Sequence, residues 1–491
     1  MINIISTTAK YLILVLMAFY TVKCFTYFTK KTAKKRKRCL NLQVFDIFAI
    51  HFLCHLTLYL NTKDKTVLAY YPIELLIAIL YIVIFHAVYP KASRLLINHI
   101  TFLMLLGYTM LTRLDHGLAV RQFILATVCL FIASFIPWIM GKLPKMRNWT
   151  ILYGVAGIFF LLTVFIPHLG VSIYGARNWI QIGPISLQPM EFVKIIFDLF
   201  VASGLVKAAT LKDVVINAVI AAAFMAVLAV EKDFGAIAIF YIAYISMVYL
   251  ATSRPIFLIS GILLVIGAVI VGYMMFKDTL FVHISVRVEA WKDPWAYQST
   301  GGYQICESLF AIGTGGFTGV GLGKGMPYYI PVVESDFIFS AMCEEMGAIF
   351  GLCLILVYLS CFIAMTNIAM KCKQPFYKYM TFGFAISFIV QVLLNIGGVT
   401  KFIPSTGVTL PLISYGISSM FGTLIMFAMV QFVYIFVAKE GEELDEEERA
   451  LRAAWTPHAT FPAGYAGAGY VGPGNAFGGI PAEAGAKRRK E

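Results

Sequence analysis

The sequence predicts an all-α protein that crosses a membrane many times. The chain has 491 residues, of which 60% are hydrophobic and only 13% are charged. A soluble protein of this length would need more polar surface to cover its core, so the bilayer must be the solvent for most of the chain. Thirteen apolar segments approach the ~20 residues that a helix needs to cross a ~30 Å hydrocarbon core. They are 9–29, 43–61, 68–89, 96–114, 120–141, 150–169, 189–207, 213–230, 234–252, 255–276, 337–365, 377–397 and 408–437.

Lysine and arginine assign the loops to the two sides of the membrane. The densest basic cluster lies at 30–38, directly after the first apolar segment, and basic residues return in every second loop. Cytoplasmic loops carry such an excess, so we expect the N-terminus outside and, because thirteen is odd, the C-terminus in the cytoplasm. The net charge of +13 is interpreted as topology and attraction to membrane lipids, not as nucleic-acid binding.

This topology puts the long loop 277–336 on the outer side, with the shorter loops 170–188, 231–233 and 398–407. The long loop contains a glycine-dense run, AIGTGGFTGVGLGKG, at 311–325. The run lacks the GxxxxGK[ST] pattern of a nucleotide loop, so a nucleotide site is rejected. Its backbone amides could still meet a lipid-linked phosphate.

One cluster of ionisable residues and two single carboxylates lie in or beside the spans, and they need an explanation because charge inside a bilayer costs a few kcal/mol. Glu191, Lys194 and Asp198 share one helical face, as a neutralised structural pair or as part of a cavity open to the outside. Asp233 lies at an outer helix end, where it is either solvated or functional. Asp336 precedes a long apolar helix, and its residue type alone favours a capping role.

A metal site is not predicted. His51 and His55 are four residues apart and could form a metal pair, but two core histidines are the preferred interpretation. The nine cysteines show no paired spacing, so neither a disulfide framework nor a zinc motif is indicated.

Six ordered motifs point to a specific protein family. In order they are YGARNWIQIGPISLQPMEFVKI (174–195), EKDFGAIAIF (231–240), RVEAWKDPW (287–295), GYQICESLFAIGTGGFTGVGLGKG (302–325), ESDFIFSAMCEEMG (334–347) and NIGGVTKFIPSTGVTLPLISYG (395–416). Together they resemble the SEDS family (shape, elongation, division and sporulation), which includes FtsW, RodA and SpoVE. The resemblance covers roughly 96–438. It implies a ten-helix core preceded by about three extra transmembrane helices in 1–95, and it leaves 439–491 as an acidic segment and a flexible tail.

The resemblance also implies an activity. Such proteins are peptidoglycan glycosyltransferases that polymerise lipid II at the outer face of the bacterial cytoplasmic membrane, usually with a class B penicillin-binding protein as transpeptidase partner. The family's catalytic aspartate corresponds to Asp336. Its QPSE-x-x-K segment corresponds to Gln188, Pro189, Glu191 and Lys194, with Met190 in place of the small residue.

Further site residues follow from the same resemblance. Arg177 matches the GAR-x-W position. The family's QPD-x-G segment appears here as EKDFG, so only Asp233 and Gly235 correspond. Ser335 stands where threonine is common, and SYGGSS becomes SYGISS at 414–419.

The expected chemistry requires a base and cations. A carboxylate such as Asp336 could free the acceptor hydroxyl, and the pyrophosphate leaving group needs positive charge. The candidate cations are Arg177, Arg287, Lys324 and Lys401. A divalent cation, Mg²⁺ or Mn²⁺, could bridge the pyrophosphate, although no ligand spacing indicates one, and no organic cofactor is expected.

Two other functions fit parts of the sequence. A lipid II flippase would also have many spans and intramembrane charges, but no inverted repeat is visible. A non-catalytic scaffold of the division machinery is the second alternative. The motifs are shared by elongation, division and sporulation members, and they assign no role to the three N-terminal helices.

Overall fold

The computed structural model describes residues 2–454 apart from 174–175, 184, 209 and 277–281. Residues 1–439 form one compact unit and 440–491 a second. The helices are α1 (Ile2–Thr29), α2 (Ala33–Thr62), α3 (Thr66–Val88), α4 (Arg94–Leu114), α5 (His116–Ser134), α6 (Ile136–Lys142), α7 (Thr150–Leu162), α8 (Pro189–Lys207), α9 (Leu211–Glu231), α10 (Phe234–Thr252), α11 (Pro255–Phe276), α12 (Val282–Lys292), α13 (Tyr303–Gly315), α14 (Ile338–Met346), α15 (Ala348–Lys371), α16 (Pro375–Val399) and α17 (Ile417–Ala454). Short 3-10 helices are η1 (Met146–Asn148), η2 (Thr163–Phe165) and η3 (Pro327–Tyr329).

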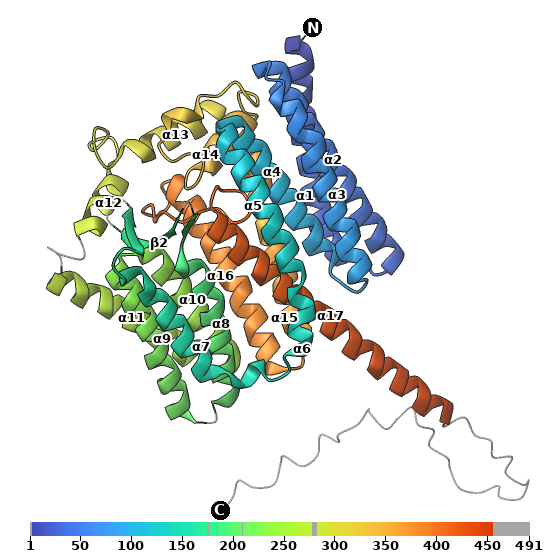
Figure 1. The fold of residues 1–491 in the computed structure, drawn as a ribbon, viewed down its shortest axis with the longest axis vertical. Helices are drawn as coiled ribbons and strands as arrows, with labels where there is room; N and C mark the ends of the chain where they lie inside the picture. Colours follow the sequence, from blue (N-terminus) through green and yellow to red (C-terminus); the bar gives the residue numbers. More distant parts are fainter. Residues whose placement is uncertain (1, 174–175, 184, 209, 277–281, 455–491) are drawn as a thin grey trace, which may run out of the picture. The chain divides into compact units, whose positions relative to one another are not determined.

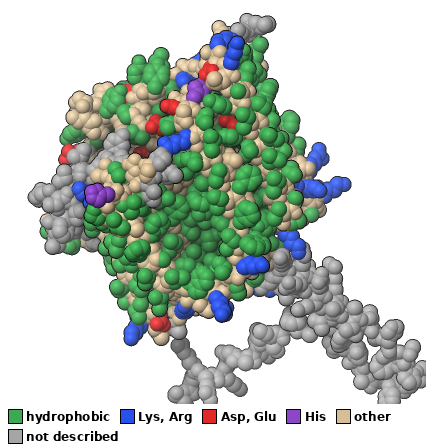
Figure 2. Space-filling view, viewed as in Figure 1, with side chains coloured by type: hydrophobic (Ala, Val, Ile, Leu, Met, Phe, Trp, Pro, Cys, Tyr) green, Lys and Arg blue, Asp and Glu red, His purple; other side chains and the backbone are tan. Residues whose placement is uncertain are grey.

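Ten helices among the described residues are long and apolar enough to cross a membrane, counting α5 and α6 together. The sequence predicted thirteen, so three predicted spans lack support by length and composition. Helix α7 is shorter, α11 is apolar over only a short described stretch, and α8 carries Glu191, Lys194 and Asp198. The chain is a multi-pass membrane protein. Figure 2 shows the corresponding wide apolar surface, with lysine and arginine gathered along its margins.

The extra N-terminal helices form a group of their own beside the rest of the compact unit. Helices α1–α3, blue in Figure 1, lie next to α4 and α5. Helix α1 also packs against α15, far away in the sequence. Helix α4 is consequently enclosed, and every residue from Leu95 to Thr112 is buried. It connects the N-terminal helices to the remaining core.

The predicted span 337–365 is wrong as a single helix. It is divided into α14 and α15 at Gly347, which has φ +92°. A Cβ there would lie 2.4 Å from the amide nitrogen of Gly319, so only glycine allows the glycine-rich loop to approach this closely. The loop also replaces lost helical hydrogen bonds, because Ala348 N donates to Gly316 O at 2.9 Å.

Two of the predicted loops contain regular secondary structure. Loop 170–188 contains a small antiparallel sheet in the order β1 (Gly170–Ile173), β2 (Ala176–Ile182) and β3 (Ile185–Leu187). Gly170 is opposite Ile180 in one pairing, and Ile180 is opposite Leu187 in the other. The long loop 277–336 contains α12, α13 and η3. The prediction of an all-α protein is therefore correct except for this small sheet.

The end of the chain also differs from the prediction. The predicted span 408–437 begins only at Ile417, and residues 403–416 form an irregular segment before it. The acidic segment 440–452 is helical, as part of α17. The predicted flexible tail, 453–491, lies almost entirely outside the described residues.

The close packing of α4 on the segment before α17 gives a first prediction. A Cβ on Gly107 would lie 2.7 Å from Ile413 O. We expect Gly107→Ala to destabilise the protein by about 1–3 kcal/mol, since backbone must move to admit the methyl group. Thermal unfolding of the detergent-solubilised protein measures this. Gly267→Ala is the control, because nothing lies within 4 Å of its Cβ position. Equal stability of both variants would contradict the packing described here.

Candidate active site

A cavity of about 320 Å³ lies where the four predicted outer segments meet. The β sheet, the turn before α10, the end of the long loop and the segment before α17 all contribute to its wall. The lining side chains and backbone come from Arg121, Ala176, Asn178, Trp179, Ser186, Gln188, Met190, Glu191, Lys232, Asp233, Arg287, Val332, Glu334, Ser335, Asp336, Thr406, Gly407, Val408, Thr409, Tyr415, Gly416, Ile417, Ser418 and Ser419. Segments distant in the sequence are thus brought together at one polar hollow.

Asp336 lines this cavity and is fixed through its backbone. Its carbonyl oxygen accepts a hydrogen bond from Asn395 Nδ2 at 2.8 Å. The flanking peptide groups are held too, because Tyr415 N donates to Glu334 O at 2.8 Å and the Ser414 hydroxyl donates to Ser335 O. This leaves the carboxylate at the cavity wall with its position determined by its neighbours.

Burial sets the protonation of Asp336. It raises the pKa of the carboxyl group to about 6, against the opposing effects of the Ser335 hydroxyl and the Arg287 charge. The structure does not support the capping explanation: α14 starts at Ile338, and its N-cap, Phe337, makes no side-chain capping hydrogen bond. Asp336 lies one residue before that N-cap, so its carboxylate is not the N-cap of α14.

Asp233 has the capping role that was expected of Asp336. Its Oδ1 accepts from Ala236 N at 3.0 Å at the start of α10. Its Oδ2 accepts from Asn178 Nδ2 at 2.8 Å. Burial raises the pKa of Asp233, and these two hydrogen bonds lower it in part. The residue is buried rather than solvated, and it ties the sheet to α10 at the cavity edge.

Glu191, Lys194 and Asp198 of α8 are buried and are held by neighbouring polar groups. Lys194 Nζ lies 2.7 Å from Glu191 Oε2 and donates to Gln391 Oε1 at 2.6 Å. One turn further along α8, Asp198 Oδ2 accepts from Ser387 at 2.9 Å. Only Glu191 of the three acidic and basic groups reaches the cavity wall. Lys194 does not line the cavity and contacts it through its ion pair with Glu191.

The cations at the cavity differ from the predicted set. Arg287 lines the cavity as predicted, and its guanidinium donates to Ser405 O at 3.4 Å. Arg121 and Lys232 line it as well, and the sequence reasoning missed both. A signal was available, because Lys232 is adjacent to Asp233 in an outer turn and Arg121 lies next to an outer loop.

Three predicted cations are not among the residues that line the cavity. Arg177 Nε donates to Val164 O at 3.0 Å. The side chain of Lys324 passes 3.5 Å from the Cβ position of Gly321, in the glycine-rich loop. Lys401 has φ +60°, and its carbonyl accepts from Trp291 at 3.1 Å. The sequence assigned these residues to the predicted outer loops, but it could not show where their side chains lie.

The amides of the glycine-rich loop are used within the protein. Glu345 Oε2 accepts from Gly323 N at 3.0 Å, and its Oε1 accepts from Gly325 N at 3.2 Å. Glu345 also pairs with Arg113 at 2.9 Å, and Glu344 accepts from Met326 N at 2.8 Å. These carboxylates occupy the amides that a phosphate would need, so the weak phosphate-binding interpretation is not supported.

Comparison with known proteins agrees with the motifs. The model of the cell cycle protein family FtsW/RodA/SpoVE matches residues 90–438. The chain belongs to this family. Peptidoglycan glycosyltransferase RodA of Mycobacterium tuberculosis is 30% identical over 368 residues, which cover 70% of this chain and 77% of that protein. Stage V sporulation protein E of Bacillus subtilis is 32% identical over 292 residues, 58% of this chain and 77% of that protein.

A solved structure supports the fold. A chain from a peptidoglycan synthase complex, studied for how polymerization and crosslinking are coordinated, has a TM-score of 0.61 and 23% identity. The match covers 70% of this chain and 98% of that one. The family match begins at residue 90, so α1–α3 lie outside the FtsW/RodA/SpoVE core.

The buried ion pair behind the cavity gives a second prediction. Lys194→Met leaves the buried carboxyl group of Glu191 without its cationic partner. We expect a loss of about 3–5 kcal/mol in the free energy of unfolding, and a smaller loss when Glu191→Gln is added. Lys207→Met, at the exposed end of the same helix, should change stability by no more than ~0.5 kcal/mol. If Lys194→Met were as mild as Lys207→Met, the pair would not be buried as described.

Proposed function

We propose that this chain, a peptidoglycan glycosyltransferase, polymerises lipid II into glycan strands at the outer face of the bacterial cytoplasmic membrane. The observation that supports this most directly is the position of Asp336 in a cavity that also contains Arg287, Lys232 and Arg121. A carboxylate with nearby cations supplies both requirements of glycosyl transfer from a lipid pyrophosphate: a base for the acceptor and compensation for the leaving group.

Asp336 acts as the general base in this proposal. Its carboxylate accepts the proton of the acceptor sugar's 4-hydroxyl while that oxygen attacks the anomeric carbon of the lipid-linked donor. The bond from that carbon to the pyrophosphate oxygen breaks, and undecaprenyl pyrophosphate leaves with the bonding electron pair. Rigid backbone anchoring by Asn395 favours such a step, because a base contributes only when it is held within reach of its proton.

The leaving group needs positive charge on the other side of the reacting carbon. Arg287, Lys232 and Arg121 are the best placed side chains, so they replace Lys324 and Lys401 as our leading candidates. Arg177 keeps a role only if its side chain moves away from Val164. We retain Glu191, Lys194 and Asp233 as residues that shape the substrate cavity.

A divalent cation, Mg²⁺ or Mn²⁺, fits the site only together with substrate. Among the described residues, no three ligand groups converge on one point of the cavity wall. Mg²⁺ commonly binds through one or two carboxylates plus substrate phosphates, and Glu191, Glu334 and Asp336 line the wall. Such an ion would neutralise charge on the departing pyrophosphate.

The membrane arrangement is part of the proposal. We propose that α7, α8 and α11 also cross the bilayer, which gives a ten-helix core and three added helices, with the N-terminus outside and the C-terminus in the cytoplasm. A class B penicillin-binding protein is the proposed transpeptidase partner. The convergence of all four predicted outer segments on one cavity favours this orientation, since the cavity then opens to the side where lipid II is polymerised.

Removing the base tests the function. Asp336→Asn keeps the shape of the side chain but cannot accept the proton, so we expect polymer formation to fall by about 10²–10⁴-fold. Purified protein in liposomes with fluorescent lipid II measures the product by gel electrophoresis. Asp115→Asn is the matched control, because asparagine also caps a helix and Asp115, the N-cap of α5, is not among the residues lining the cavity.

The same experiment separates the alternatives. Full activity of Asp336→Asn would refute the assignment of the base. Transbilayer movement of lipid II without polymer, by the parent protein, would indicate a flippase. Absence of both activities, with the partner transpeptidase added, would indicate a scaffold.

The raised pKa of Asp336 predicts a pH dependence. Its value of about 6 is above the usual 3.8, so the base form is complete well above pH 6 and is lost as the pH falls through 6. We expect kcat/KM to decrease about tenfold per pH unit below that point. A profile between pH 4.5 and pH 8 with the parent protein and Asp336→Asn checks this. A flat profile for the parent, or the same inflection in the variant, would assign the titration to another group.

A further inference from the structure

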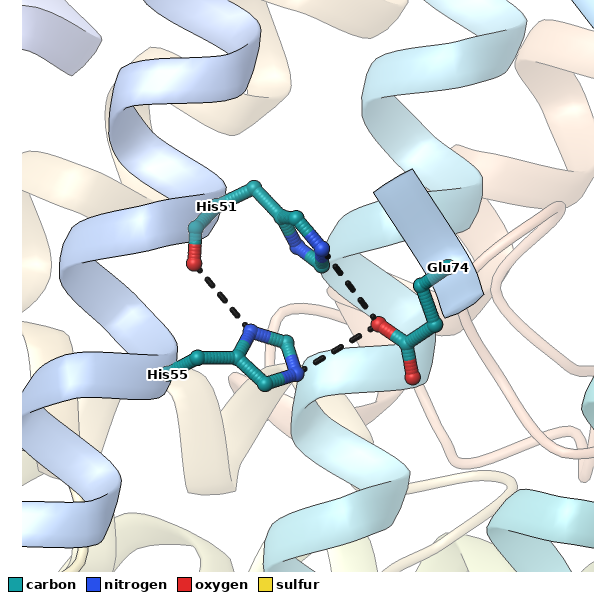
Figure 3. Close-up of side chains that lie close together, drawn as sticks. All are labelled: His51, His55 and Glu74. Carbon is teal, nitrogen blue, oxygen red and sulfur yellow. Dashed lines mark hydrogen bonds and ion pairs between the residues drawn. The ribbon is translucent and has the colours of Figure 1, made fainter. Parts of the chain in front are cut away.

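A buried cluster in the N-terminal helices joins α2 to α3. His51 and His55 lie one turn apart on α2, and Glu74 faces them from α3 (Figure 3). Glu74 Oε2 is 3.5 Å from His51 Nε2 and 3.4 Å from His55 Nε2. None of the three side chains lines the proposed active-site cavity, so the cluster requires an explanation of its own.

Four polar atoms of this cluster are buried without hydrogen-bond partners among the described residues. The exposed fractions of His51, His55 and Glu74 are 3%, 1% and 4%. Both nitrogens of His51, Nε2 of His55 and Oε2 of Glu74 lack a hydrogen bond within the described residues. Leaving even one such group unsatisfied costs about 1–3 kcal/mol. One ligand atom from each of the three residues lies close to the other two, which indicates a missing shared partner.

The geometry favours a metal ion as that partner. The three ligand atoms lie within 4.8 Å of one another. In a tetrahedral site with bonds of about 2.0–2.1 Å, neighbouring ligand atoms are roughly 3.4 Å apart. The two contacts of Glu74 match that separation, whereas a good hydrogen bond between these atoms would be shorter, at about 2.7–3.0 Å.

The contact made by its other ring nitrogen suits His55 for binding a metal through Nε2. Its Nδ1 lies 3.1 Å from His51 O. If Nδ1 carries the proton and donates it to that carbonyl, Nε2 has its lone pair directed at the cluster. Hydrogen bonding of the second ring nitrogen is the usual arrangement of a metal-bound histidine. The ring of Tyr71 covers the pair, with centroids 5.2 Å from His51 and 5.6 Å from His55.

We propose that His51, His55 and Glu74 bind a divalent transition metal ion, with Zn²⁺ as the best fit to two imidazoles and a carboxylate. Water completes the coordination. The ion connects α2 to α3 and stabilises the helical group that precedes the family core. This proposal is independent of the glycosyltransferase assignment, because its residues and its measurements are different.

Metal binding to the purified full-length chain tests the proposal. After chelator treatment in detergent, titration with Zn²⁺ should give about one tightly bound ion per chain and raise the unfolding temperature. Co²⁺ should produce the visible absorption of a four-coordinate site. Glu74→Gln and His55→Gln should each weaken binding by at least ~10-fold, and the zinc-dependent rise in unfolding temperature should disappear.

A control variant and the behaviour expected of a metal-free cluster distinguish the two explanations. His86→Gln changes a histidine on α3 that lies outside the cluster, and it should leave binding unchanged. A simple hydrogen-bonded cluster predicts that Glu74→Gln alters the stability equally with and without Zn²⁺. That result, or tight binding that survives both Glu74→Gln and His55→Gln, would overturn the proposal.

Discussion

The proposed active-site cavity depends on one buried interaction, the hydrogen-bonded ion pair of Lys194 and Glu191 with Gln391. Gln391 accepts from Lys194 through Oε1. Its Nε2 donates to Thr409 O at 3.2 Å and to Ser419 Oγ at 3.1 Å. One amide side chain of α16 thus connects α8, the irregular segment before α17 and α17 itself. Because Glu191 and Thr409 both line the cavity, losing this connection would release two of its walls together.

Sequence reasoning found the membrane class, the family and most of the cavity segments, because these depend on local features. Hydrophobic runs reveal spans directly, and ordered motifs reveal ancestry. It failed for features that depend on tertiary contacts, such as helix breaks and side-chain positions. The break at Gly347 depends on a loop approaching from residues 316–319, and nothing in 337–365 alone indicates that contact. The positions of Lys324 and Lys401 depend in the same way on packing that no pattern encodes.

The glycine-rich loop shows why composition alone is ambiguous. Its amides could in principle have bound a phosphate of the substrate. The carboxylate of Glu345 satisfies two of them, and Arg113 on α4 neutralises that carboxylate. A buried carboxylate needs such partners, so the loop and α4 are attached to α14. The glycines therefore allow the backbone of the loop to approach α14 closely. The loop contributes to the site indirectly, because it holds the segment that precedes α14.

The carboxylates around the cavity differ in what holds them, and this difference supports the choice of base. Asp233 is bound through both oxygens to Ala236 and Asn178, and Glu191 is bound to Lys194. Such groups are committed to structure, and accepting a proton would break their interactions. Asp336 is anchored instead through its backbone carbonyl. Its Oδ2 lies 3.6 Å from the Cβ position of Gly407, which has φ +71°. A side chain there would only touch the carboxylate, so it is the positive φ of Gly407 that favours glycine beside Asp336.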